Sequence, residues 1–152
     1  MKIQASAAAL AVGLFILPAS HAVAQSLGEV HMHKSPYCGC CTDWADALSA
    51  AGYTVKTTSV EDLHPIKQQA GIPNDLMSCH TATLNGYVLE GHVPLEAIAK
   101  LLEEKPEIRG LSVPGMPLGS LGMGEPDAET RYTVYAYGGK AKVPKPYLEV
   151  GK

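Results

Sequence analysis

The feature of this chain that most constrains its fold is the crowding of its cysteines. Three of the four are Cys38, Cys40 and Cys41, and the fourth is Cys79. A disulfide framework joins loops that are distant in sequence, so this spacing is a poor scaffold and better suits a metal or redox centre. Cys38 and Cys41 are three residues apart, so they share one face if a helix begins there, and the helix N-terminus then favours their thiolate forms.

The segments around the cluster alternate between strand and helix patterns. Residues 29–34 are typical of a strand, which Ser35-Pro36 ends just before the cysteines. Apolar residues at spacings of three and four, from Trp44 to Ala51, then predict a helix that Gly52 ends. Residues 53–59 predict a second strand, parallel to the first because a helix connects the two. The cysteine cluster is therefore expected at a strand-to-helix junction.

The next segments complete a small α/β core. Residues 62–70 predict a helix, and Asn85-Gly86 predicts a hairpin between strands 81–84 and 87–90. A further helix is predicted between Pro94 and Pro106, with Leu95, Ile98, Leu101 and Leu102 as its buried stripe. The resulting order, βαβα followed by ββα, predicts a single domain of thioredoxin-like α/β fold.

The C-terminal part of the chain is harder to assign. Residues 111–126 are rich in glycine and proline and show no periodicity, which predicts a long irregular loop. A short edge strand is expected over 132–137. The last residues are expected to form a loose tail.

The N-terminus has the layout of a secretory signal peptide. Lys2 precedes an apolar run over 7–17, and Ala22-Val23-Ala24 supplies a cleavage site. The run is shorter than the roughly 20 residues of a membrane-spanning helix. We therefore predict a signal peptide over 1–24, a mature domain over 25–152, a periplasmic location and no membrane association after cleavage. The formal net charge of −3 leaves no basic surface for nucleic acid or anionic lipid.

Residues after the first helix offer further metal donors. In a thioredoxin-like fold the loop that enters the third strand passes over the cysteine cluster, and here that loop carries Cys79 and His80. Cys79 could equally be a small buried residue or a disulfide partner of Cys40. His80 and His92 could be ligands or hydrogen-bonded core residues.

Two methionines and two further histidines stay ambiguous. Met116 and Met123 lie in the Gly/Pro-rich loop, where their thioethers could bind Cu(I) or fill gaps beneath the loop. His31 and His33 share one face of the first strand, where they could chelate a metal or simply be solvated. Their role is left open.

Four motifs in the same order resemble the CopG-like family, which was once catalogued as a domain of unknown function. The resemblance spans residues 30–138 and implies a periplasmic, thioredoxin-like, copper-binding protein linked to copper resistance. It also implies a metal site at Cys38, Cys40, Cys41 and Cys79. The glycine-rich loop departs from the family pattern, with Leu121 in place of a proline. The motifs are Ser35-Pro36 through Cys38-Gly39-Cys40-Cys41 to Trp44, Ser78-Cys79-His80-Thr81, Glu90-Gly91-His92-Val93-Pro94, and 110–123.

The leading hypothesis is a protein that binds Cu(I) and exchanges it with other periplasmic copper carriers or exporters. Thiolates can bridge Cu(I) ions that need only two or three soft ligands each, so a small multinuclear cluster is expected. A thiol-disulfide or copper-dependent oxidoreductase using Cys38 and Cys41 is the alternative. A structural zinc site is less favoured, since four-cysteine zinc sites usually use two separated pairs. The predicted metal ligands are Cys38, Cys40, Cys41 and Cys79, with His80, His92, Met116 and Met123 as auxiliary donors.

Overall fold

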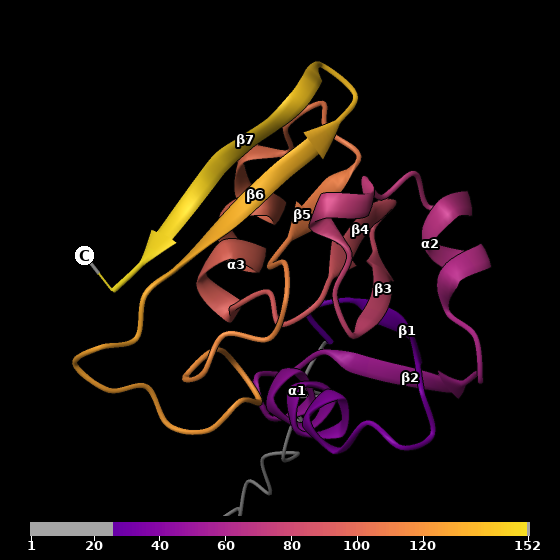
Figure 1. Cartoon of the computed structure of the whole chain (residues 1–152), viewed down its shortest axis with the longest axis vertical. Coiled ribbons are helices and arrows are strands. Elements are labelled where there is room, and N and C mark those ends of the chain that lie inside the picture. Colours follow the sequence, from indigo (N-terminus) through magenta and orange to yellow (C-terminus); the bar gives the residue numbers. More distant parts are fainter. Residues whose placement is uncertain (1–25, 152) are drawn as a thin grey trace, which may run out of the picture.

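Strand β1 (Glu29–Lys34) lies second from one edge of a seven-stranded sheet in the computed structural model, which describes residues 26–151 (Figure 1). Val30 and Met32 are fully buried, whereas Glu29 and His31 on the other face are exposed. This period-2 alternation is what pleated backbone produces. The strand has the predicted limits. The expected signal peptide, 1–24, lies outside the described residues.

Helix α1 (Gly39–Ala50) contains Cys40 and Cys41 and is followed by β2 (Thr54–Ser59). Strands β1 and β2 pair in parallel, as the predicted crossover requires. Trp44 and Leu48 are the fully buried apolar residues on the inner face of α1. The predicted helix and the predicted parallel pairing are both confirmed.

The chain then reaches the centre of the sheet. Helix α2 (His64–Gln69) and the short 3-10 helix η1 (Asn74–Leu76) lead into β3 (His80–Leu84), which runs antiparallel to β1. A tight turn joins β3 to β4 (Tyr87–Glu90), and both of its central residues have positive φ, 49° at Asn85 and 87° at Gly86. Asn-Gly accepts this conformation readily, so the predicted hairpin is confirmed.

Apolar side chains form two clusters. The larger one contains α1, α3 (Leu95–Glu104) and inward residues of five strands, with Trp44, Met32 and Ile98 fully buried. The smaller one contains Ile72, Leu76, Val88 and Tyr137. Val88 and Leu89 are neighbours on β4 and belong to different clusters, so the sheet separates the two.

The C-terminal part corrects three expectations. Leu111 belongs to β5 (Gly110–Ser112), so the irregular loop begins only after that strand. Strand β6 (Tyr132–Gly138) is not an edge strand, because β7 (Ala141–Val150) pairs with it antiparallel. The expected loose tail is therefore an edge strand. Its two prolines obscured the pattern, but an edge strand tolerates residues without an N–H.

The expected fold class is confirmed as mixed α/β, and the thioredoxin-like assignment stays a prediction. Within residues 26–151, no helix is long and apolar enough to cross a membrane.

Candidate metal centre

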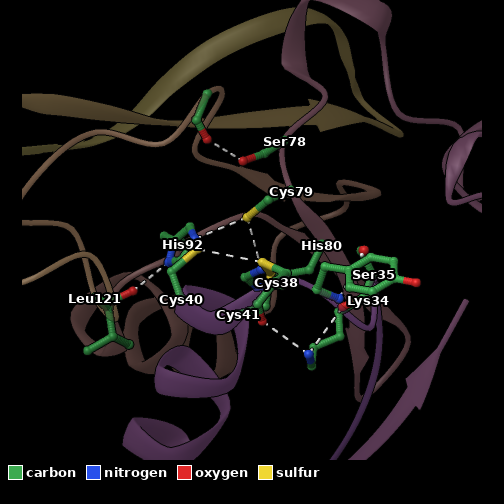
Figure 2. The surroundings of a disulfide bond; sticks show 12 residues. Lys34, Ser35, Cys38, Cys40, Cys41, Ser78, Cys79, His80, His92 and Leu121 are labelled. Atoms are coloured by element: carbon green, nitrogen blue, oxygen red, sulfur yellow. Dashed lines mark hydrogen bonds between the residues drawn. A yellow bond between two sulfur atoms is a disulfide. The ribbon is translucent and has the colours of Figure 1, made fainter. Parts of the chain in front are cut away.

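Three cysteines lie at the start of α1, Cys38 just before the helix and Cys40 and Cys41 in its first turn. Cys38 is the N-cap residue, and its amide donates a 3.2 Å hydrogen bond to the Ser35 carbonyl. The Lys34 ammonium, on a nearly buried side chain, donates to the carbonyls of Ser35 (3.2 Å) and Cys38 (3.0 Å). These hydrogen bonds are made to backbone atoms of the turn and involve none of the cysteine sulfurs (Figure 2).

Cys38 and Cys41 form a disulfide, with their Cα atoms 5.4 Å apart. This corrects the expectation that the clustered cysteines avoid disulfides: a spacing of three at a helix start brings two Cα atoms within bridging distance. Cys40 and Cys79 are free thiols, so the alternative Cys40–Cys79 disulfide is not present. The Cys40 Sγ lies 3.5 Å from the Cys38 Sγ.

Cys79 reaches the same place from the loop before β3. The Ser78 amide donates a 2.6 Å hydrogen bond to Glu90 Oε1, and the Ser78 hydroxyl donates to the Gly115 carbonyl. Ser78 also forms an isolated bridge with Gly115. Ser78, which precedes Cys79, is therefore held both by Glu90 and by Gly115. The Sγ atoms of all four cysteines lie within 4.8 Å of one another, as the loop-over-cluster prediction required.

His80 and His92 extend the group of donors beyond sulfur. The Cys79 Sγ lies 3.0 Å from His92 Nε2 and 3.3 Å from His80 Nδ1. Both histidines are fully buried, and the His80 ring centroid is 4.6 Å from Trp44 and 5.1 Å from His92. His92 Nδ1 lies 2.7 Å from the Leu121 carbonyl, so that nitrogen is the protonated one. Figure 2 shows both rings beside the sulfur atoms.

Burial sets the protonation of this group. It raises the pKa of the Cys79 thiol to about 11, with the charge of Cys40 adding to the effect. It lowers the pKa of His80 to about 3 and also lowers the pKa of His92. At neutral pH both imidazoles are therefore neutral and able to bind a metal, whereas Cys79 must lose a proton to do so.

A buried polar network behind Cys79 was not anticipated. Glu90 is fully buried and accepts hydrogen bonds from Lys67 Nζ (2.6 Å) and the Thr81 hydroxyl (2.7 Å) as well as from Ser78. Burial raises the pKa of Glu90, and the Lys67 ammonium opposes that rise. The signal in the sequence was a carboxylate directly after the apolar run of β4. Nothing local indicated which lysine would pair with it.

The remaining predicted donors are less closely associated. Met116 is 55% exposed, and Met123 lines a surface pocket with Pro117 and Thr130, in whose wall no cysteine or histidine is found among the described residues. His31 forms a 2.7 Å contact with the carboxylate of Glu29 on the exposed face of β1. The structure therefore unites six of the eight predicted ligands and leaves both methionines as predictions.

Comparisons with known proteins agree with this picture. A family described as "Protein of unknown function, DUF411" matches residues 76–123. A solved structure named "Copper resistance protein copG- Form 1" is 35% identical, with a TM-score of 0.74, and the match covers 82% of this chain and 98% of that one. Its "Form 2" gives the same identity and TM-score over 80% and 97%. No curated protein matches the chain.

Proposed function

This chain belongs to the family of copper resistance protein CopG, and from that premise we propose that it is a periplasmic protein that binds Cu(I) through clustered cysteine thiolates. In this role it contributes to copper resistance by sequestering copper or transferring it to other copper carriers or exporters. The proposal includes cleavage of a signal peptide over 1–24 and a thioredoxin-like fold.

One observation carries the proposal: four sulfur donors from two separate segments lie within 4.8 Å of one another. Thiolates are soft ligands that select Cu(I), whereas carboxylates and carbonyls suit harder ions. Cys38, Cys40 and Cys79 are half-buried and Cys41 is fully buried, so the group is partly accessible to solvent.

Donor counting favours more than one copper ion per chain. Cu(I) is satisfied by two or three soft ligands, and a thiolate can bridge two ions. Adjacent Cys40 and Cys41 cannot easily direct both sulfurs to an ion that Cys38 already holds. Bridging within a small cluster relieves this conflict, and Cys79 closes the cluster from the opposite loop. His80, His92, Met116 and Met123 are auxiliary donors in the proposal.

Copper can use all four thiolates only after the Cys38–Cys41 disulfide has been reduced. Reduction adds two electrons and two protons, and metal binding then releases the protons of the coordinating thiols. The reduced chain is therefore the form in which the proposal must be tested.

The test is an anaerobic titration of the reduced chain with Cu(I), followed by native mass spectrometry. We expect a multi-copper species, fewer copper ions in Cys79→Ser, and no change in the control His64→Gln, whose exposed side chain lies outside the site. A plateau at one copper that Cys79→Ser leaves unchanged would contradict the cluster. Displacement of Cu(I) by an equal concentration of Zn(II) would contradict the choice of metal.

A second candidate function is thiol-disulfide or copper-dependent oxidoreduction at Cys38 and Cys41. The observation in its favour is that this pair forms a disulfide at a helix N-terminus. Cys40, 3.5 Å from Cys38, is placed to compete for that disulfide, which works against simple dithiol exchange. We expect negligible insulin reduction by the metal-free protein. Robust turnover that survives Cys79→Ser would make this the leading function.

A further inference from the structure

The seven-stranded sheet has two edges, and they differ in how they are protected from other chains (Figure 1). Strand β7 forms one edge and carries Pro144 and Pro146, which lack the N–H group that a further strand would bind. Its pairing with β6 also contains register shifts, which make the edge irregular. Prolines and bulges are features that keep an edge strand from pairing with another chain, so the β7 edge is protected.

Strand β2 forms the other edge and has none of these features. The strand contains no proline, its pairing with β1 is regular over all six residues, and five of the six are exposed. Its one charged residue is Lys56, whose ammonium lies 2.7 Å from the Glu29 carboxylate on β1. The β2 edge is therefore able to pair with a further strand, whereas the β7 edge is not.

The hydrogen bonds between β1 and β2 show which backbone groups of β2 face outward. The Thr54 amide donates to the Gly28 carbonyl, and the Val60 amide donates to the Lys34 carbonyl, each at 2.9 Å. Along one strand of a parallel pair, the residues that bind the neighbour alternate with residues that do not. The even-numbered residues of β2 therefore bind β1, and the amides and carbonyls of the odd-numbered residues point away from the sheet.

These outward groups complement a second copy of the same strand. An antiparallel pair centred on Thr57 places Thr57 opposite itself, and it places Val55 opposite Ser59 of the second copy. Opposed residues of this kind exchange two backbone hydrogen bonds each, which gives about six hydrogen bonds across the edge. The edge is therefore complementary to itself under a two-fold axis.

The side chains favour this register. Two Thr57 side chains lie opposite each other, and threonine pairs are favourable across neighbouring strands. Lys56 lies opposite Thr58 of the second copy, so no like charges are directly opposed. A register centred on Lys56 uses the same outward backbone groups, but it opposes two ammonium groups and is destabilised.

We propose that the β2 edge is a homodimer interface, in which the β2 strands of two copies pair antiparallel about Thr57 and join the two sheets into one. The occupant is a second copy because the strand complements itself both in hydrogen bonds and in charge. The paired strands run in opposite directions, so the cysteine groups, which follow β1 in each copy, lie toward opposite ends of the pair. The inference does not rest on the proposed function.

The experiment uses the position of Thr57 on the two-fold axis. Sedimentation velocity of the purified protein, from micromolar to millimolar concentration, should show a dimer that dissociates on dilution. Thr57→Lys and Thr57→Glu should each weaken the dimer by about tenfold or more, because each variant opposes like charges, whereas an equal mixture of the two should associate. The control Val143→Lys adds a charge at an exposed position of the β7 edge and should change nothing.

Hydrogen exchange of the wild-type protein locates the interface without any variant. As the concentration rises, the amides of Val55, Thr57 and Ser59 should become protected, whereas the Lys56 amide, which faces β1, should not change. A protein that stays monomeric at millimolar concentration would overturn the inference. A dimer that both Thr57 variants leave intact would also overturn it, because that dimer uses another surface. If the mixed variants failed to associate, the two-fold register would be wrong.

Discussion

The donors of the site come from two regions that are built differently. Cys38, Cys40 and Cys41 lie at the start of α1, where the described hydrogen bonds hold the backbone and two of the three cysteines are half-buried. Cys79, His80 and His92 lie at the start of β3 and just after the end of β4, where Glu90 binds the Ser78 amide, the Leu121 carbonyl binds His92 and Trp44 packs against His80. In the helix region the described hydrogen bonds hold the backbone, whereas in the strand region they also hold a donor side chain, the His92 ring.

The largest expected effect comes from removing the anchor of the strand region. Glu90→Ala would leave the Lys67 ammonium buried with no carboxylate and would release the Ser78 amide. Breaking a buried ion pair in this way costs about 3–5 kcal/mol. Urea unfolding of the metal-free disulfide form measures this loss of stability.

The matched control for this prediction is Glu29→Ala, which breaks an exposed ion pair with Lys56 on the same sheet. We expect it to leave the unfolding midpoint nearly unchanged, because exposed pairs add little to stability. If Glu90→Ala also left the unfolding midpoint nearly unchanged, the contrast between the two regions would be wrong.

A pair of glycine variants gives the next largest contrast. An alanine at position 91 would adopt φ +71°, with its Cβ 2.6 Å from the Ser78 Cβ and from the Val113 carbonyl oxygen. We expect a loss of about 2–3 kcal/mol in the free energy of unfolding, together with weaker Cu(I) binding by the reduced chain. Urea unfolding curves measure the loss of stability, and a Cu(I) titration of the reduced variant measures the loss of metal binding.

The control here is Gly39→Ala, in the first turn of α1, where the added Cβ would meet nothing within 4 Å. Alanine favours a helix, so this variant should be neutral or more stable by about 0.5–1 kcal/mol. A destabilised Gly39→Ala would show that the helix start is as tightly constrained as the strand loops.

The smallest predicted effect concerns thiol reactivity in the metal-free disulfide form. Burial raises the pKa of Cys79 to about 11, so at pH 8 only about one Cys79 in a thousand is a thiolate. We expect alkylation of Cys40 to be at least about tenfold faster, and the Cys79 rate to rise about tenfold per pH unit from 8 to 10. Timed alkylation with peptide mass spectrometry measures both. Equal alkylation rates of Cys40 and Cys79 at pH 8 would contradict this prediction.

Prediction from the sequence worked well where the signals are local. The limits of β1, the Asn85-Gly86 turn and the helix after the cysteines follow from periodicity and turn chemistry within a few residues. The position of Cys79 beside the cysteine cluster was also predicted, from the loop that enters the third strand. Strand β7 was missed because edge strands with prolines lack the usual alternation.

By itself, the sequence determined the donor types, their crowding at a strand-to-helix junction and the α/β character of the core. Only the tertiary structure decided which sulfurs join in a disulfide, that Lys67 pairs with Glu90, and that the Leu121 carbonyl fixes the His92 ring. The last two contacts join residues 23 and 29 positions apart, so packing and strand pairing select the partners. Local sequence patterns do not specify these partners, because several lysines and backbone carbonyls along the chain could form the same hydrogen bonds.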